Sequence, residues 1–283
     1  MEEKLLSDQT RSDLVDFARE IRKKTLYTIG KLGAGHIGGS LSIVDILALL
    51  YGHEMKYDPQ KPAAPDRDVL VLSKGHAGPA LYAALALKGF FPMDWLDTLN
   101  QGGTRLPSHC DRNKTPGIDM TTGSLGQGLS LACGMALGRK MDGSKASVFC
   151  IIGDGETDEG QNWEAAMFAP QYRLSNLIAF TDYNKMQIDG TTEQVMDLRD
   201  LDGKWKSFGW YVERCNGHDF SAMHSAISRS RSQAEGQDAR PAMIILDTIK
   251  GKGAAFSEGK FESHHMPVTM EMAETASAAL GGK

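Results

Sequence analysis

The second half of this chain alternates continuous apolar segments with amphipathic ones, and this alternation limits the fold more than any other feature. The segments SVFCII (147–152), NLIAFTD (176–182) and AMIILDT (242–248) are almost wholly apolar, so an extended chain there has no polar face. Strands of this kind occur in parallel sheets whose two faces are covered by helices. The sequence therefore predicts an α/β fold, a parallel sheet with helices on both faces.

The expected strands lie at 68–73, 147–152, 176–182, 209–215 and 242–248. Apolar residues at helical spacing predict helices at 76–89, 92–100, 124–140, 160–171, 197–208 and 219–232. Two helices precede the sheet, 8–32 capped by Ser7 or Asp8 and about 40–52 capped by Ser40. We expect a single domain over 1–283, with a helical part at about 8–65, the sheet and its helices at about 66–250, and a C-terminal loop and tail at 251–283.

Composition excludes several classes of partner. The chain has 283 residues and a formal net charge of -5, which gives no footprint for nucleic acid. Its longest apolar run, 41–51, is interrupted by Asp45 and is too short to span a membrane. No CxxC pair suggests a zinc site. We therefore expect a reduced, cytoplasmic protein whose four cysteines are Cys110, Cys133, Cys150 and Cys215.

An acidic run, GDGETDEG, follows the apolar segment 147–152 and contains Asp154, Glu156, Asp158 and Glu159. A calcium-binding EF-hand loop that began at Asp154 would need glycine at its sixth position and glutamate at its twelfth. Those positions hold Glu159 and Ala165, so the run is not such a loop. We expect Glu156 and Asp158 to be solvated.

Gly153, Asp154 and Gly155 form a different kind of signal. Two glycines around one aspartate at the end of a strand let the backbone approach a ligand and offer one hard oxygen ligand. Asn184 follows the next strand, and the ends of neighbouring parallel strands meet at one edge of a sheet, where ligands bind. The pair predicts a magnesium ion bridged to phosphate.

The segment GAGHIG (33–38) matches the GxGxxG dinucleotide fingerprint, but a helix and not a strand is expected before it. We therefore interpret it as a glycine-permitted turn between two helices. His36 within it has no such structural explanation.

GDG followed by 28 residues and then Asn is the thiamine diphosphate binding motif, and the chain resembles the N-terminal, diphosphate-binding domain of transketolase. The order and spacing of the matches cover about residues 10–270. Further matching segments are GAGHIGGSLS (33–42), VLSKGHAGPALYAAL (71–85), LPSHCDRNKTPGIDMTTGSLGQGLS (106–130) and DTIKGKG (247–253).

The resemblance implies thiamine diphosphate and a divalent ion, Mg²⁺ or else Ca²⁺ or Mn²⁺. The implied metal ligands are Asp154, Asn184 and the backbone carbonyl of Met186. The implied cofactor-binding residues are His76, Gly123, Ser124, Leu125, Gly153, Asp154, Gly155, Asn184 and His264. Of these, the Gly155 amide and His76 would contact the diphosphate, and 123–125 would lie against the aminopyrimidine ring.

The catalytic residues that the resemblance implies are His36, His76, His109, Glu159 and His264. His36 and His109 match histidines that bind donor hydroxyls and move protons. The sequence SHH leaves His264 and His265 as alternatives, and ungapped counting from KGKG favours His264. Glu159 matches a glutamate that hydrogen-bonds the catalytic glutamate of the partner domain and links two active sites.

Other histidines carry weaker signals. The family usually has Gly-His-Pro where this chain has Ser108-His109-Cys110, a difference that could alter donor specificity. No motif surrounds His53, His218 or His224, so we expect these side chains to be on the surface or bonded locally.

Full-length transketolases continue into a pyrimidine-binding domain and a C-terminal domain, which this chain does not contain. It therefore resembles the small, N-terminal subunit of a split transketolase that moves a two-carbon ketol unit from a ketose phosphate to an aldose. The implied partner is a C-terminal transketolase subunit in an α2β2 assembly. That subunit would supply the catalytic glutamate and most contacts to the sugar phosphate, so activity would require both chains.

The sequence leaves two alternative functions open. A 2-oxoacid dehydrogenase α subunit or a deoxyxylulose-phosphate synthase would share GDG and Asn, but not the three sugar-facing histidines in these contexts. A non-catalytic scaffolding subunit would have no reason to keep Asp154, Asn184 and His76.

Overall fold

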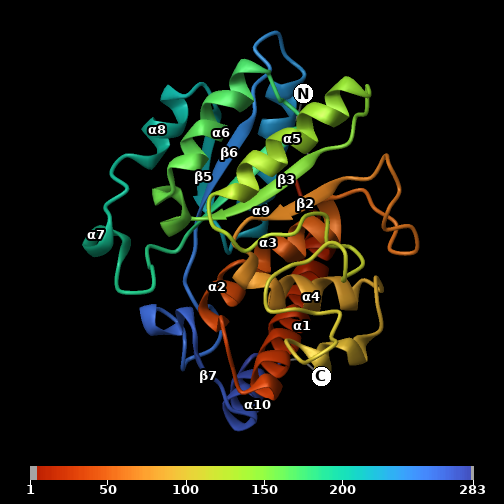
Figure 1. Cartoon of the computed structure of the whole chain (residues 1–283), viewed down its shortest axis with the longest axis vertical. Coiled ribbons are helices and arrows are strands. Elements are labelled where there is room, and N and C mark those ends of the chain that lie inside the picture. Colours follow the sequence, from red (N-terminus) through yellow and green to blue (C-terminus); the bar gives the residue numbers. More distant parts are fainter. Residues whose placement is uncertain (1–4, 282–283) are drawn as a thin grey trace.

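The computed structural model describes residues 5–281, and its centre is a parallel sheet. All five strands of this sheet run parallel, in the order β2-β3-β4-β6-β5 (Figure 1). Their bounds are Val69–Leu72 for β2, Val148–Gly153 for β3, Leu177–Tyr183 for β4, Tyr211–Asn216 for β5 and Ala242–Asp247 for β6. The predicted strands and fold class are confirmed.

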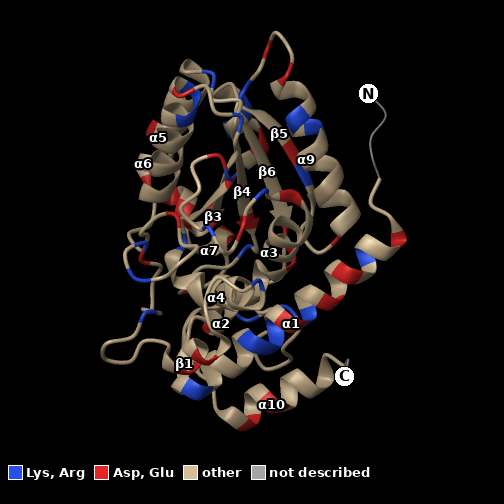
Figure 2. Cartoon of the chain, turned by 90° about the vertical axis from the view of Figure 1, so that its right-hand side faces the viewer, with Lys and Arg blue, Asp and Glu red and all other residues tan. Residues whose placement is uncertain are grey.

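Helices cover both faces of the sheet because alternate strand residues point to opposite sides. In β3, Phe149 and Ile151 pack toward one face, and Cys150 and Ile152 toward the other. Figure 2 shows α5 and α6 on one side and α3 and α9 on the other. The bounds are Val44–Leu49 for α3, Gly78–Leu87 for α4, Gln127–Met141 for α5, Gly160–Gln171 for α6 and Phe220–Ala234 for α9.

The first helix, α1 (Asp8–Leu32), begins as expected, because the Ser7 side chain accepts a hydrogen bond from the Thr10 amide. Gly33 ends it with a φ of 93°, a left-handed conformation that glycine adopts without strain. The short strand β1 (Ala34–Gly35) follows directly. The segment 33–38 thus connects two helices, as predicted, but it is more than a turn: it contains β1, and residues 37–38 already belong to α2, with His36 at the N-cap.

The helix predicted at about 40–52 is wrong in detail. Three short pieces occupy this region: α2 (Ile37–Ser42), α3, and a π-helical turn at Leu50–Glu54. Ser40 is inside α2, where its hydroxyl donates to the His36 carbonyl, so it is not a cap. Since almost every residue here is buried, no polar face marked the break at Ile43 in the sequence.

Three other helix predictions also change. The segment expected as 92–100 is a 3₁₀ helix over Met93–Thr98, and the segment expected as 76–89 begins with a 3₁₀ turn over Gly75–Ala77. The helix expected at 197–208 is replaced by α7 (Thr192–Val195) and α8 (Leu201–Ser207).

Residues 251–283, expected as loop and tail, contain regular structure instead. A 3₁₀ turn (Phe261–His264) leads into β7 (Met266–Pro267), which pairs antiparallel with β1. Helix α10 (Met270–Ala279) then lies along α1, and the two lie side by side in Figure 1. Their approach depends on Gly30, because a Cβ there would lie 2.7 Å from Ala273 Cβ.

No helix within residues 5–281 is long and apolar enough to cross a membrane. All four cysteines are free, and Cys110, Cys133 and Cys150 are buried in apolar surroundings.

Candidate functional site

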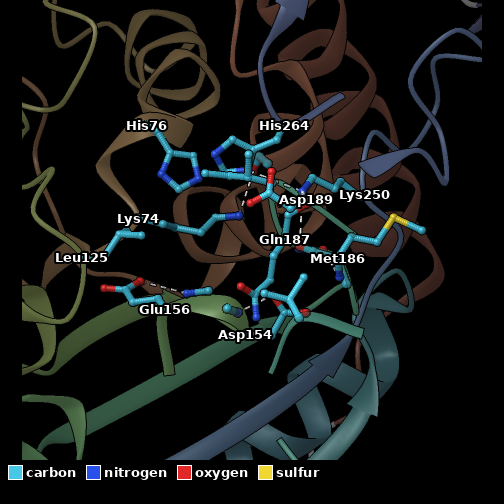
Figure 3. A pocket seen from close by; sticks show the side chains of 16 residues that line it. Lys74, His76, Leu125, Asp154, Glu156, Met186, Gln187, Asp189, Lys250 and His264 are labelled. Carbon is cyan, nitrogen blue, oxygen red and sulfur yellow. Dashed lines mark hydrogen bonds between the residues drawn. The ribbon is translucent and has the colours of Figure 1, made fainter. Parts of the chain in front are cut away.

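A cavity of about 160 Å³ opens at the carboxyl ends of β3 and β4. Figure 3 shows His76 and His264 side by side on one side of it and Asp154 on the other. Most of the predicted metal and diphosphate residues line this cavity, namely His76, Leu125, Gly153, Asp154, Gly155, Asn184, Met186 and His264.

Asp154 stands at the end of β3, where the backbone bends into the 3₁₀ turn Gly155–Asp158. One carboxylate oxygen accepts from the Gly155 amide at 2.8 Å and the other from the Lys185 amide at 2.5 Å. Burial, together with the nearby Asp182 carboxylate, raises the pKa of Asp154 to about 7. A cation bound beside such a buried carboxylate would strongly stabilise its charged form.

Asn184 and Met186 lie beside Asp154, after the end of β4. The Asn184 side-chain oxygen accepts from the Met186 amide at 3.1 Å. The carbonyls of Met186 and Gln187 accept from the Lys250 ammonium at 3.2 and 3.3 Å. Burial lowers the pKa of Lys250 to about 8, so its ammonium is mostly charged at pH 7 but loses its proton within about one pH unit above that.

A buried ion pair that sequence reasoning missed adjoins the cavity, which Lys74 helps to line. Lys74 and Asp182 are 2% and 0% exposed, and their charged atoms are 2.5 Å apart. Asp182 also accepts from Ser42 at 2.7 Å, Asn184 at 3.0 Å and Thr248 at 2.5 Å. Burial acts to raise the pKa of Asp182, but the Lys74 ammonium and these donors hold it below its usual value. Asp182 thereby fixes the orientation of Asn184.

The expectation that Glu156 is solvated is wrong, whereas Asp158 is exposed as predicted. Glu156 is 3% exposed, and its carboxylate accepts from the Ser73 hydroxyl and from the amides of Gly126 and Gly153. Burial raises its pKa, and these three donors oppose that rise. Glu156 ties the loop before α5 to the end of β3, so its role is structural.

The residues present fit a divalent ion bound to a diphosphate. The metal ligands expected there are all oxygen atoms, which suit Mg²⁺ or Ca²⁺. Glycines keep the approach open: a Cβ at Gly39 would lie 3.3 Å from His76 Nε2, and one at Gly155 would lie 2.7 Å from Gln187 Cγ. Lys74 and Lys250 also line the cavity and add positive charge that suits a diphosphate.

A cluster of five histidines adjoins the cavity, with His36 at its centre. The centroid of the His36 ring lies 5.2 Å from that of His76, 5.8 Å from His109, 5.4 Å from His264 and 4.7 Å from His265. Burial lowers the pKa of His36 to about 4 and that of His264 to about 3, and it also lowers the pKa values of His76 and His109. The rings of His36, His76, His109 and His264 are therefore neutral near pH 7.

The structure separates the two histidines that the sequence left as alternatives. His264 lines the cavity with its Nδ1 3.5 Å from Lys250 Nζ and its ring 5.0 Å from that of His76. His265 lines a different cavity, next to His36. Of the two, His264 is the one that lines the cavity at the strand ends.

The segment 123–125 lies next to His109. Gly123 has a φ of 154°, and a Cβ there would lie 3.3 Å from the His109 ring. Leu125 lines the cavity and is 36% exposed, and Ser124 accepts a side-chain hydrogen bond from Gln127 at 3.3 Å. An apolar side chain at the rim suits contact with a flat ring.

Glu159 lies outside the cavity. It is exposed at the start of α6, and its Cβ is packed against Gly126, whose φ is 87°. Within residues 5–281 its carboxylate has no hydrogen-bond or ion-pair partner, so it is free to bond another chain.

The remaining histidines are bonded locally or exposed, as predicted. His218 bonds Asp45 at 2.7 Å and accepts from the Ile249 amide at 2.9 Å. His224 bonds Glu54, and the exposed His53 is near both, so that these three residues resemble a metal-binding group. The Glu54 carboxylate is also paired with Arg231, whose positive charge opposes a metal ion there.

The comparison with families finds that the family model described as transketolase, thiamine diphosphate binding domain, matches residues 14–283. Among curated proteins, the 6-deoxy-6-sulfo-D-fructose transketolase subunit SqwG of Clostridium sp. (strain MSTE9) is 60% identical over 268 residues, 95% of this chain and 96% of that protein. An apulose-4-phosphate transketolase subunit of Phocaeicola vulgatus is 42% identical over 90% of this chain and 89% of its own length.

Solved structures give the same family. Transketolase from Campylobacter jejuni matches with a TM-score of 0.87 and 29% identity, over 98% of this chain and 43% of that one. The Pichia stipitis transketolase complex with sedoheptulose-7-phosphate matches with a TM-score of 0.88 and 28% identity, over 94% of this chain and 41% of that one. This chain spans about two fifths of the length of these enzymes.

Proposed function

This chain belongs to the transketolase family, in which it corresponds to the thiamine diphosphate-binding N-terminal part, and on that basis we propose its donor, its metal and its partner. It is one subunit of a split transketolase, a transferase that moves a two-carbon ketol unit. The family match displaces the 2-oxoacid dehydrogenase and deoxyxylulose-phosphate synthase alternatives.

The proposed donor is 6-deoxy-6-sulfofructose. The observation that carries this choice is the 60% identity, over nearly the whole of both chains, to a subunit named for that sugar, compared with 42% to a subunit named for apulose 4-phosphate. Carbons 1 and 2 would pass to an aldose. Carbons 3 to 6 would leave as a four-carbon aldose that retains the sulfonate.

The proposed cofactor site combines the strand ends and the histidines. Asp154, Asn184 and the Met186 carbonyl would hold Mg²⁺, and His76, His264 and the Gly155 amide would bind the diphosphate. Residues 123–125 would lie against the aminopyrimidine ring. When bound, thiamine diphosphate would supply a nucleophilic carbon for the ketose carbonyl and an electron sink for cleavage of the sugar bond between carbons 2 and 3.

His36 and His109 would orient the donor and exchange protons with its hydroxyls. Because burial lowers the pKa values of both rings, they are neutral near pH 7 and can each donate and accept a hydrogen bond. His76 and His264 would act in the same neutral form toward the cofactor.

The proposed partner is a second polypeptide with the pyrimidine-binding and C-terminal domains of transketolase, in an α2β2 assembly in the cytoplasm. Its catalytic glutamate would bond Glu159, whose carboxylate is exposed and without a partner in the described part of the chain. The subunit naming of the relatives and the partial coverage of full-length transketolases support this proposal. Free cysteines support a reducing compartment.

The test is ketol transfer by the two chains together, with thiamine diphosphate and Mg²⁺. 6-Deoxy-6-sulfofructose and fructose 6-phosphate form a matched pair of donors that differ in the terminal anion. We expect a higher kcat/KM for the sulfonate donor and release of the four-carbon sulfonated aldose, identified by mass spectrometry. A preference for fructose 6-phosphate or xylulose 5-phosphate would contradict the proposed donor.

A further inference from the structure

A second cavity, of about 220 Å³, adjoins the histidine cluster. His36 belongs to its lining, whereas the neighbouring His76 and His264 line the cofactor cavity. One part of the lining is apolar and consists of Ile29, Leu32, Pro79 and Leu99. The polar side chains of the lining are His36, Asn100, Ser108 and His265.

Backbone pairing fixes the place of His265. In the β1–β7 ladder, Gly35 is opposite Met266 and Ala34 is opposite Pro267, so the next pair outward is His36 and His265. The Val268 amide also donates to the Gly33 carbonyl at 3.0 Å. The two rings therefore meet, with centroids 4.7 Å apart. The ring of His265 is thereby held next to that of His36 in the lining of the second cavity.

Three polar side chains in the second cavity have no partner in the described part of the protein. The Asn100 amide, the Ser108 hydroxyl and the His265 ring make no side-chain hydrogen bond within residues 5–281. Asn100 is held in a left-handed conformation with a φ of 57°, and its backbone amide donates to the Leu106 carbonyl at 2.9 Å. Asn100 and His265 are exposed and Ser108 is half-buried, so each can bond a ligand in this cavity without breaking a hydrogen bond within the protein.

The cavity offers no fixed charge. Among the described residues that line it there is no lysine, arginine, aspartate or glutamate. Phosphate and sulfonate groups are usually bound by arginine or lysine. Neutral donors and acceptors beside an apolar wall instead suit hydroxyl groups on a carbon chain.

We propose that this cavity binds the hydroxyl-bearing carbons of the donor ketose that are not transferred, and that His265 is a specificity-determining residue there. The inference rests on the proposed function, because it requires a ketose whose carbons 1 and 2 occupy the cofactor cavity. The remaining carbons must extend past His36, toward His265, Ser108 and Asn100. The terminal anion is then bound outside this cavity, by the partner subunit.

The experiment uses the two-chain enzyme loaded with thiamine diphosphate and Mg²⁺, and compares His265→Ala with His265→Gln. For six-carbon ketose donors we expect His265→Ala to raise KM about fivefold, the loss of about one neutral hydrogen bond, while kcat stays within about twofold. Gln can still donate and accept, so it should recover most of the loss. His53→Ala is the matched control, an exposed histidine outside both cavities.

Hydroxypyruvate provides a control within the same enzyme. It carries the same two-carbon ketol unit, but its remaining carbon leaves as carbon dioxide, so it has no hydroxylated chain to enter the second cavity. We expect its KM to be unchanged by His265→Ala. Fructose 6-phosphate and 6-deoxy-6-sulfofructose should be affected equally, because the anion is bound elsewhere.

Three results would overturn the proposal. An unchanged ketose KM in His265→Ala would show that His265 does not contact the donor. An equal loss with hydroxypyruvate would show that His265 acts through His36 or the cofactor. A large change in the ratio between the phosphate and sulfonate donors would show that the cavity binds the anion. If the unmodified enzyme transferred a ketol unit from no ketose, this result would contradict the proposed function, and therefore also the proposed subsite.

Discussion

The strand ends and the histidine cluster form two halves of one site, and they differ in how fully this chain satisfies its own polar groups. At the strand ends, the Lys74–Asp182 pair is buried and each member has several hydrogen bonds. In the histidine cluster, the rings of His36, His109 and His265 contact other rings but have no hydrogen-bond partner within residues 5–281.

The difference follows from the supporting structure. Asp154, Asn184 and Asp182 are on adjacent central strands or directly after them, where parallel pairing fixes the backbone. His36 and His265 are on loops joined by a ladder of two residue pairs. We conclude that the half proposed to hold metal and diphosphate is preorganised by this chain alone, whereas the histidine half leaves its polar groups open to other molecules.

Removal of one member of the buried Lys74–Asp182 pair should have the largest effect of the changes that distinguish the two halves. Lys74→Met would leave the Asp182 carboxylate buried without its cation, which costs about 3–5 kcal/mol of unfolding free energy. Chemical denaturation measures this loss. Lys185→Met is the control, because the Lys185–Asp247 pair is exposed at 4.0 Å and should contribute less than about 1 kcal/mol. Equal losses would contradict a preorganised strand-end half.

Asp154→Ala should weaken thiamine diphosphate binding to this chain by about 100-fold or more in the presence of Mg²⁺, since loss of even an outer-shell partner costs about 10–100-fold in metal affinity. Calorimetric titration of the chain alone gives the affinity. Asp158→Ala, a change to an exposed aspartate in the same acidic run, should have little effect. Unchanged binding in Asp154→Ala would favour the scaffolding alternative.

The two halves should also respond differently to pH. The pKa of Asp154 is raised to about 7, so the metal must displace a proton from it below that pH but not above. Metal-dependent cofactor affinity should therefore fall by up to about tenfold per pH unit below pH 7. The pKa values of His36 and His264, about 4 and 3, keep those rings neutral in this range.

One variant tests whether the histidine half contributes to this pH profile, whose upper end also includes the titration of Lys250, with a pKa of about 8. His264→Gln should lower the affinity without changing the shape of the profile between pH 5.5 and 8, a range chosen around the Asp154 pKa of about 7. A profile that disappears in His264→Gln would place the titrating group in the histidine half.

The smallest expected effect concerns the loop that carries Lys250. The Ile249 amide donates to His218 Nε2, so His218 Nδ1 carries the proton that bonds Asp45. His218→Asn can keep the bond to Asp45, and His218→Gln can keep the one to Ile249. We expect cofactor affinity to fall about fivefold in the Asn variant, for one lost hydrogen bond, and less in the Gln variant. The reverse order would mean that the Asp45 contact matters more.

The sequence allowed much of the strand-end half to be predicted, because apolar strands place Asp154 and Asn184 at one edge of a sheet. It did not reveal Asp182 and Lys74 as partners, although each is a charged residue at the end of an apolar run. The pairing depends on Ser42 and Thr248, which are far away in the chain. Local sequence carries no signal for such contacts.

The other differences between prediction and structure concern Glu156, α10 and residues 37–54. Glu156 was expected in solvent because the acidic run is so polar, but it is buried with Ser73 and two backbone amides. The missed α10 did have a signal: Thr269 caps it by accepting from the Met272 amide, ahead of an amphipathic segment. The division of residues 37–54 into three helical pieces had none, because almost the whole segment is buried, its polar Ser40, Ser42 and Asp45 included, so no exposed polar face marks the breaks.

The most direct test of the central claim is ketol transfer measured while the second polypeptide is titrated into a fixed amount of this chain. The mixture contains thiamine diphosphate, Mg²⁺, an aldose acceptor, and xylulose 5-phosphate or 6-deoxy-6-sulfofructose as donor. We predict that this chain alone binds the cofactor but transfers nothing, and that the rate rises to a plateau at equal amounts of the two chains. Turnover by this chain alone would contradict the claim that its sugar-facing half is incomplete.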